Sequence, residues 1–186
     1  MKKGKIYVVS GPSGVGKGTI VKKLIEDYDN IALSVSATTR SPRTGEVDKV
    51  HYFFMSKDEF TDIIDKDGFI EYAEYCGNYY GTPKAAVYEK LEQGFDVILE
   101  IEVQGGIQVM EKFPQACGIF ILPPSMPVLE KRLRGRQSED EETIQKRLQT
   151  AKEEMSKINR YHCFVVNGPI ERAVADVAEI IEKNRD

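Results

Sequence analysis

Four short runs of consecutive apolar residues punctuate the chain, separated by longer stretches in which polar and apolar residues mix. The runs cover residues 6–9, 97–99, 119–122 and 164–166. A continuous apolar run of this length is typical of a strand buried on both faces, whereas a half-exposed strand alternates apolar and polar residues. The pattern therefore predicts a parallel central sheet.

The stretches between and after these runs show the spacing of helices. The last stretch places Val174, Val177, Ile180 and Ile181 on one helical face. Helices are predicted over residues 19–28, 83–93, 144–157 and 170–183. Strands that alternate with helices require right-handed crossovers, so we predict an α/β three-layer sandwich.

Two segments interrupt this alternation. In residues 34–82 aromatic residues cluster, and short strands and turns are predicted, including a hairpin that pairs residues 69–75 with 79–82. In residues 127–155 charged residues dominate, and Ser138 followed by Glu141 predicts a capping box that starts a helix.

We therefore divide the chain into a core and two inserts. The core comprises residues 1–33, 83–126 and 156–186, the first insert residues 34–82, and the second residues 127–155.

Composition narrows the class of protein. The 186 residues suffice for one compact unit, and 26 basic against 30 acidic residues give a net charge of −4, which argues against a nucleic-acid-binding surface. No apolar run exceeds four residues, so we expect neither a membrane-spanning helix nor a signal peptide. Three scattered cysteines fit reduced thiols in the cytoplasm. Two histidines do not suffice for a histidine-rich metal site.

A glycine-rich segment follows the first predicted strand and opens the first predicted helix. It consists of Gly11, Pro12, Ser13, Gly14, Val15, Gly16, Lys17, Gly18 and Thr19. Glycines permit backbone angles that direct successive N–H groups onto phosphate oxygens, and the helix N-terminus adds a partial positive charge. Lys17 is placed to reach the β- and γ-phosphates. The alternative is a glycine-rich turn with a chance lysine, which the strand–loop–helix context disfavours.

One position departs from the usual pattern of phosphate loops. Ser or Thr, whose hydroxyl ligates magnesium, usually follows the lysine, but here Gly18 follows it and Thr19 comes next. Either Thr19 contacts a phosphate instead, or magnesium is held mainly through water and the nucleotide. The departure weakens the metal assignment and leaves the phosphate assignment intact.

Arginines indicate two phosphate-bearing ligands. Six arginines fall into two clusters, namely Arg40 and Arg43 in the first insert and Arg132, Arg134, Arg136 and Arg147 in the second. Phosphoryl transfer depends mostly on positioning and charge neutralisation, and the arginine fork binds phosphate oxygens bidentately. One cluster would bind an acceptor, while the other closes as a lid over the donor. A solvated helix face is the alternative for the second cluster.

The motifs of the chain disfavour a GTPase. No asparagine begins the base-recognition motif Asn-Lys-x-Asp, and the match to D-x-x-G at residues 65–68 falls in a predicted turn.

Several segments together resemble guanylate kinase. They are the phosphate loop, residues 36–46 (SATTRSPRTGE), residues 69–73 (FIEYA), residues 77–82 (GNYYGT) and residues 134–136 (RGR). The similarity runs in order from Lys5 to about Asn167. It implies a P-loop core with a GMP-binding insert and a helical lid, and transfer of the γ-phosphoryl group of ATP to GMP or dGMP with Mg²⁺, in purine nucleotide metabolism.

The resemblance also implies an acceptor site. The GMP phosphate would be held by Arg40, Arg43, Tyr52 and Tyr80, and guanine by Ser36, Glu71, Thr82 and Glu102. Glu71 would accept two hydrogen bonds from the base, Ser36 and Thr82 would contact O6, and Glu102 would lie near the 2-amino group. Packing within the hairpin is an alternative for Tyr52 and Tyr80 and is the predicted role of Tyr79.

On the donor side, the resemblance implies that residues 11–19 bind the ATP phosphates and that Lys17, Arg132, Arg136 and Arg147 are catalytic. Glu100 would hold magnesium through water, although simple solvation at the sheet edge is an alternative for Glu100 and Glu102. Arg134 is expected to be structural. Asn167 either approaches the adenine or only ends its strand.

Two alternative functions compete with this interpretation, one a binding module and the other a different kinase. A guanylate-kinase-like interaction module would bind phosphorylated peptides without catalysis, but it needs neither Gly16-Lys17 nor a lid rich in arginine. A kinase for another nucleoside monophosphate is opposed by Glu71. The expected partners are ATP and GMP or dGMP, with no nucleic acid and no membrane, and the oligomeric state is left open.

Overall fold

A five-stranded parallel sheet forms the centre of the protein. The computed structural model describes residues 3–75, 77–135 and 140–185. The strands lie in the order β2-β7-β1-β8-β9, and all four neighbouring pairs are parallel. Their bounds are β1 Ile6–Ser10, β2 Ile31–Leu33, β7 Asp96–Glu100, β8 Cys117–Leu122 and β9 Cys163–Val166. The predicted parallel sheet is confirmed, and β2 is a strand that the sequence pattern did not reveal.

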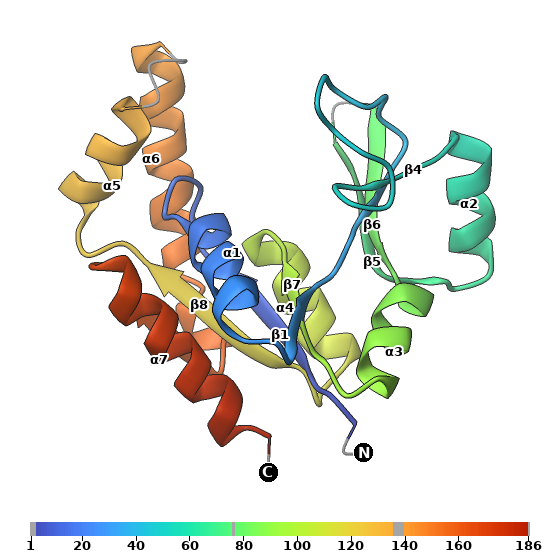
Figure 1. The fold of residues 1–186 in the computed structure, drawn as a ribbon. Helices are drawn as coiled ribbons and strands as arrows, with labels where there is room; N and C mark the ends of the chain where they lie inside the picture. Colours follow the sequence, from blue (N-terminus) through green and yellow to red (C-terminus); the bar gives the residue numbers. More distant parts are fainter. Residues whose placement is uncertain (1–2, 76, 136–139, 186) are drawn as a thin grey trace.

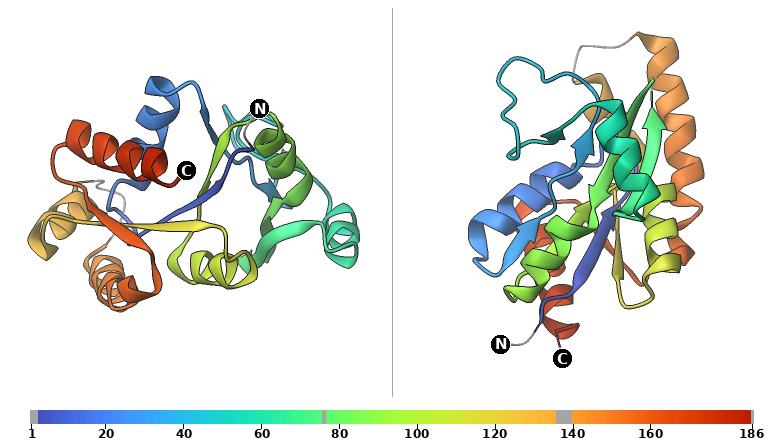
Figure 2. Two further views of the ribbon diagram at one scale, coloured as in Figure 1. Left: turned by 90° about the horizontal axis from the view of Figure 1, so that it is seen from below. Right: turned by 90° about the vertical axis from the view of Figure 1, so that its right-hand side faces the viewer.

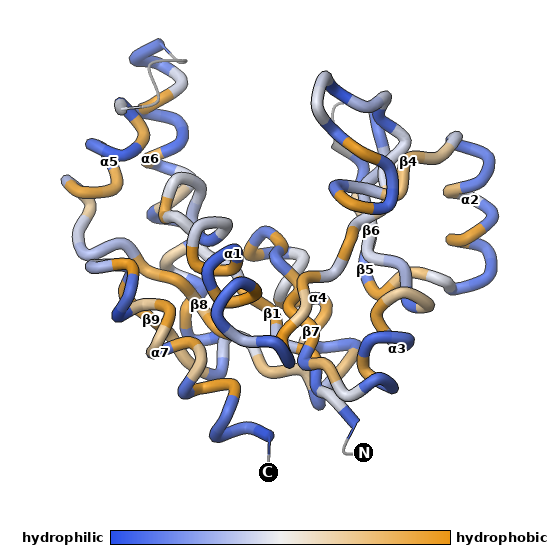
Figure 3. Tube along the Cα trace, viewed as in Figure 1, coloured by the Kyte–Doolittle hydropathy of each residue, from blue (hydrophilic) through white to orange (hydrophobic). Residues whose placement is uncertain are grey.

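Helices cover both faces of this sheet, so the predicted three-layer sandwich is confirmed. On one face α1 (Lys17–Asp27) and α7 (Ile170–Lys183) pack against Tyr7 and Val9. On the other, α3 (Lys84–Glu92) and α4 (Val103–Lys112) pack against Ile6 and Val8. Figure 2 shows α1 and α7 on one side of the strands and α4 on the other. The hydrophobic segments gather along the central strands (Figure 3).

The first insert carries a second sheet and a helix. Strands β3 (Ala37–Thr38), β4 (Phe53–Phe54), β5 (Phe69–Tyr75) and β6 (Asn78–Pro83) lie in the order β4-β3-β6-β5. β5 and β6 are antiparallel, which confirms the predicted hairpin. Phe60, Phe69 and Tyr79 form the core of the insert, so the packing role predicted for Tyr79 is also confirmed.

The expectation that residues 34–82 hold only short strands and turns is wrong, because Lys57–Asp65 forms helix α2. Ser56 and Glu59 make a complete capping box at its start, and the helix buries Phe60. Both signals were present in the sequence, but the surrounding aromatic residues suggested strands. The turn predicted at residues 65–68 is confirmed at the end of this helix.

The second insert is a helical pair. Helix α5 (Met126–Arg134) packs on α6 (Glu141–Met155) through Leu129, Leu133, Ile144, Leu148 and Ala151. The cap of α6 is Asp140, whose side chain accepts a hydrogen bond from the Thr143 N–H at 2.8 Å. Ser138, which was predicted to cap this helix, lies outside the described residues.

The two inserts rise from the core as separate arms (Figure 1). Each has its own small hydrophobic cluster, distinct from the two clusters that flank the central sheet. Within the described residues, no helix is both long and apolar enough to cross a membrane.

Phe60 provides a test of this separation. Its ring is fully buried and stacks on Phe69 and Tyr79, with centroid distances of 4.3 and 5.4 Å. We expect Phe60→Ala to destabilise the first insert by about 3–5 kcal/mol because it leaves a cavity. Hydrogen exchange should accelerate at amides of β5 and β6 but not at those of β1. The exposed neighbour Asp62 supplies the control Asp62→Ala, and equal acceleration in both sheets would contradict separate cores.

Candidate active site

The glycine-rich loop lies between the end of β1 and the start of α1, as predicted. Gly14 and Gly16 have φ angles of +83° and +98°, in the left-handed region that side chains with a Cβ disfavour. Their positions are also crowded, because a Cβ at Gly14 would lie 2.6 Å from Leu133 Cδ2 and one at Gly16 would lie 2.5 Å from Asn167 Nδ2. The loop conformation therefore depends on glycine at both places.

The carbonyl oxygen of Val15 anchors the loop to two other elements. It accepts hydrogen bonds from Arg132 Nη1 at 2.9 Å and from Asn167 Nδ2 at 2.7 Å. Arg132 Nη2 also donates to the Asn167 carbonyl oxygen at 2.9 Å. Arg132 thus joins helix α5 to the loop, and Asn167 does more than end β9. Arg132 and Asn167 line a depression of about 330 Å³ together with Gly14, Gly16 and Thr19.

Lys17 lies at the centre of a cluster of carboxylates. Its Nζ donates to the Gly11 carbonyl oxygen at 2.5 Å. Burial lowers the pKa of Lys17, while Glu100, Glu154 and Glu102 oppose that shift. Burial in turn raises the pKa of Glu100, and Lys17 opposes it. The buried ammonium group is therefore balanced by carboxylates from several elements.

Glu100 is the residue best placed to serve a metal ion. A Cβ at Gly18 would lie 3.5 Å from Glu100 Oε1, so this carboxylate stands beside the position that is Ser or Thr in most phosphate loops. Within the described residues, no group of three or more His, Cys, Asp or Glu side chains could hold a metal ion. One carboxylate beside a phosphate loop nevertheless fits Mg²⁺, which keeps several waters and binds through one or two carboxylates and nucleotide phosphates.

A second pocket, of about 440 Å³, opens between the first insert and the carboxyl end of β7. Six predicted site residues line it, namely Ser36, Tyr52, Glu71, Tyr80, Glu100 and Glu102. The rings of Tyr52 and Tyr80 lie edge to face, with a centroid distance of 6.3 Å. Both residues line this pocket, which disfavours the alternative that they belong to the hairpin core.

Glu71 is the least exposed acid on the insert side of this pocket. Its Oε1 accepts a hydrogen bond from Thr82 Oγ1 at 2.6 Å. Burial raises the pKa of Glu71, Thr82 lowers it, and the neighbouring Glu102 raises it. Glu102 is the N-cap of α4, where its carboxylate accepts from the backbone N–H groups of Gln104, at 2.7 Å, and Gly105. This capping role had not been foreseen.

Arg40 is held in position by Glu46, a residue that the sequence analysis did not assign to the site. The two side chains form a bidentate pair with both N–O distances at 2.9 Å, and the Arg43 N–H donates to Glu46 at 2.7 Å. The guanidinium of Arg40 also lies 5.5 Å from the Tyr52 ring centroid. The regular spacing of three residues from Arg40 to Arg43 and on to Glu46 was the sequence feature that could have indicated this role of Glu46.

The remaining arginines differ in their roles. Arg134 pairs with Glu130 at 2.8 Å and with Glu141 at 2.5 Å, which agrees with the structural role expected of it. Arg147 is partly buried on α6. Arg136 lies outside the described residues, and Arg43 is exposed at the rim of the insert.

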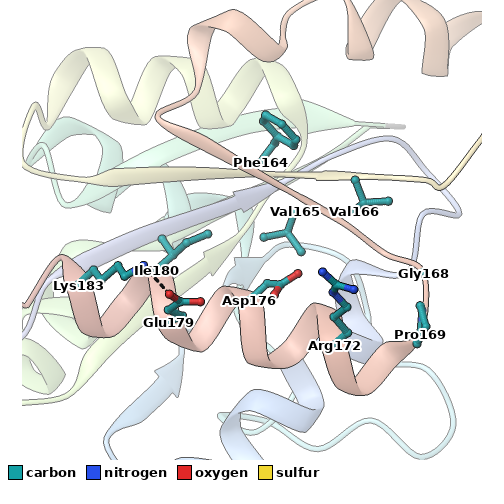
Figure 4. Close-up of a pocket in the computed structure, with 10 residues that line it drawn as sticks. All are labelled: Phe164, Val165, Val166, Gly168, Pro169, Arg172, Asp176, Glu179, Ile180 and Lys183. Carbon is teal, nitrogen blue, oxygen red and sulfur yellow. Dashed lines mark hydrogen bonds and ion pairs between the residues drawn. The ribbon is translucent and has the colours of Figure 1, made fainter.

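A third hollow, of about 500 Å³, lies between β9 and α7 (Figure 4). Its charged lining residues are Arg172, Asp176, Glu179 and Lys183, and Lys183 pairs with Glu179. Two of these residues are basic and two are acidic, and the ten lining residues include no predicted site residue. The phosphate loop and the pocket of Glu71 are therefore the sites to which the chemistry points.

A phosphate loop beside a separate pocket lined by tyrosine and glutamate side chains defines a nucleotide-binding phosphotransferase of the P-loop class. The family model for guanylate kinase matches residues 3–184. Guanylate kinase of Clostridioides difficile is 52% identical, with 100% of this chain and 91% of the relative covered. That of Prochlorococcus marinus (strain NATL2A) is 50% identical, with 94% of each covered.

The solved structures agree. The crystal structure of guanylate kinase from Anaplasma phagocytophilum superposes with a TM-score of 0.76 at 34% identity, covering 99% of this chain and 87% of that one. The chain belongs to the guanylate kinase family. The resemblance found in its motifs is thereby confirmed.

The Arg40–Glu46 pair makes stability depend on pH in a defined direction. Hydrogen bonds from Arg40 and from the Arg43 N–H lower the pKa of Glu46 from 4.5 to about 2. A lowered pKa in the folded state stabilises above the unfolded value, and this contribution disappears as pH falls through about 2. We expect Glu46→Gln to lower the thermal unfolding midpoint near pH 7, with the difference vanishing near pH 2. Glu92→Gln, at an exposed position of α3, is the control. A difference independent of pH would contradict the assignment.

Proposed function

We propose that the chain transfers the γ-phosphoryl group of ATP to GMP or dGMP through the residues assembled above. Guanylate kinases are ATP:GMP phosphotransferases, and the family is shown. The observation that carries the residue assignments is the presence of two separate phosphate-directed sites at one edge of the central sheet. In this proposal residues 34–82 bind GMP, residues 127–155 act as the lid, and the other residues form the core. In this proposal the reaction takes place in the cytoplasm and belongs to purine nucleotide metabolism.

The donor phosphates lie in the loop of residues 11–19. Backbone N–H groups and the N-terminus of α1 contact the phosphate oxygens, and Lys17 neutralises charge on the transferred group. Arg132 has five N–H donors, of which the structure commits one to Val15 and one to Asn167. Within the described residues, the other N–H groups of Arg132 have no hydrogen-bond partner and can turn to phosphate. Arg136 and Arg147 are the further arginines that this proposal assigns to the donor phosphates. Asn167 borders the adenine side of the site.

The acceptor phosphate is held by Arg40, Arg43, Tyr52 and Tyr80. Glu46 and the Ser41 carbonyl oxygen take three of the five N–H groups of Arg40, counting two at Nη1 and one at Nη2. The Tyr80 side chain is a further hydrogen-bond partner of Arg40, and the hydrogens that are not committed to Glu46 or Ser41 are the second one at Nη2 and the one at Nε. These two point in parallel from one edge of the guanidinium plane and suit two oxygens of a phosphate dianion.

Glu71 recognises guanine. The N1–H and 2-amino groups of guanine are donors that one carboxylate can accept together, whereas adenine offers an unprotonated N1 and would leave a buried carboxylate unsatisfied. Ser36 contacts O6, as does Thr82 once its hydroxyl, which donates to Glu71 in the structure, has rotated. Glu102 lies near the 2-amino group while its oxygens also cap α4.

The reaction needs no general base, because the acceptor phosphate is already anionic. Guanylate kinases generally use ATP with Mg²⁺, which would neutralise phosphate charge, and Glu100 would hold it through water. The protein side chains contribute orientation, charge neutralisation and the exclusion of water.

Formation of ADP, measured with GMP, AMP, CMP and UMP as acceptors, tests the proposal. We expect turnover with GMP to exceed that with the other three by orders of magnitude, and Lys17→Ala to reduce kcat sharply. An interaction module would turn over none of them, and another nucleoside monophosphate kinase would prefer a different acceptor. Lys17→Ala with activity within about twofold of the unmodified protein would reject the loop assignment.

Glu71→Gln tests the recognition of the base. The substitution keeps the shape but replaces one accepting oxygen with an NH₂ group that faces donors of guanine. A lost charged hydrogen bond of about 1.5–3 kcal/mol corresponds to a loss of roughly 10- to 150-fold in kcat/KM for GMP.

Inosine monophosphate provides the matched ligand control, because it lacks the 2-amino group but keeps N1–H and O6. Its kcat/KM should be lower than that of GMP with the unmodified protein and should fall by a smaller factor on Glu71→Gln. Equal factors for both nucleotides would show that Glu71 does not contact the 2-amino group.

A further inference from the structure

Glu154 brings the lid helix to the phosphate loop. It lies in the last turn of α6, seven residues after Arg147. Seven residues are close to two full turns, so both side chains project from the same face of one helix. At Glu154 this face lies against the phosphate loop, where the backbone N–H of Ser13 donates to the carboxylate. The mechanism described above makes no use of Glu154.

The surroundings of the Glu154 carboxylate are unusual for an acid. Its Oε2 is buried and has no hydrogen-bond partner within the part of the chain that the structure describes. The backbone N–H of Ser13, in the loop, donates a hydrogen bond to the carboxylate and lowers its pKa. The charged neighbours of Glu154 are Lys17, Glu102 and Lys157. Lys157 donates to Gln104 Oε1 at 3.2 Å. Burial is the main effect and raises the pKa of Glu154, against the influence of Lys17.

A carboxylate whose buried oxygen lacks a partner carries a desolvation cost, which a nearby positive charge or a hydrogen-bond donor can offset. The counter-charge available is the Lys17 ammonium group, and the available donor is the Ser13 N–H. These are the groups that donor phosphate uses in a phosphate loop. A carboxylate and a triphosphate are both anions, and they would repel each other if both occupied this place.

We propose that Glu154 competes with the donor phosphates for Lys17 and for the Ser13 N–H, and thereby weakens donor binding. The proposal rests on the phosphate-loop part of the proposed function. It makes Glu154 a positioning residue that sets donor affinity rather than a group that contacts the transferred phosphoryl.

Calorimetric titration with ATP, and with tripolyphosphate as a probe without a nucleoside, tests the competition. We expect Glu154→Gln to bind both about 3- to 10-fold more tightly than the unmodified protein, because the repelling charge is removed and Lys17 loses a partner. Glu154→Asp keeps the charge and should stay closer to the unmodified protein. GMP binds at the other site, so its affinity should not change.

The neighbouring residue supplies a matched control. Glu153 is exposed on the same helix and accepts a hydrogen bond from Gln149, so Glu153→Gln removes an equal charge away from the loop and should leave ATP affinity unchanged. Glu154→Ala should shift affinity in the same direction as Glu154→Gln.

Damage to packing gives a different pattern, since it would weaken ATP binding, and would do so for Asp as much as for Gln. Either that pattern or unchanged affinity in Glu154→Gln and Glu154→Ala overturns the proposal. If the unmodified protein binds neither ATP nor tripolyphosphate, the phosphate-loop assignment itself fails, which is a separate outcome.

Discussion

The burial of the Lys17 ammonium group at the end of an apolar sheet is the constraint on which the rest of the site depends. A buried cation is costly unless carboxylates compensate it, and burial does lower the pKa of Lys17. The compensating acids come from three places, namely the end of β7 (Glu100), the N-cap of α4 (Glu102) and the last turn of α6 (Glu154). The central sheet, helix α4 and the second insert therefore each contribute to one electrostatic cluster.

The two arms also have small apolar clusters of their own. An arm that packed continuously with the central sheet could not change position without exposing the main core. Here each arm has an apolar cluster of its own, and Ile70 and Met155 are the described arm residues that join a cluster of the central sheet. The bond from Arg132 to Val15 is a polar link to the loop. Polar contacts can be exchanged for contacts with a ligand at small net cost, because each partner finds a substitute.

The sequence predicted those features that depend on local or strongly periodic patterns. The buried strands, the phosphate loop, helix α7 and the β5–β6 hairpin all follow from short-range spacing, and the structure bears them out. Helix α4 was missed because Gly105 and Gly106 weaken its helical pattern. Gly106 is required there, since a Cβ would lie 2.3 Å from the Tyr161 hydroxyl, which is 55 positions away in sequence. A contact of that kind leaves no local signal.

The site shows the same division. Motif spacing brought Ser36, Tyr52, Glu71 and Tyr80 to one pocket correctly, but it assigned no role to Glu46, and it did not reveal that Glu102 caps a helix. Both roles are hydrogen bonds whose geometry depends on the folded backbone. The sequence did not indicate a role for Glu154 either, for a different reason. It lies in a charged helix where an acid is the ordinary surface residue, and only the fold turns that position toward the loop.

The base pocket adds a requirement that sequence motifs do not state. In the proposed recognition of guanine, Glu71 accepts two hydrogen bonds only when it is ionised, yet burial and the nearby Glu102 both favour its neutral form. The hydrogen bond from Thr82, at 2.6 Å, favours the charged form. Glu102 repels less than a free carboxylate would, because the amides of Gln104 and Gly105 partly satisfy its charge. The cap of α4 and the hydroxyl of Thr82 thus both favour the ionised form of Glu71, which is the form that the proposed recognition of guanine requires.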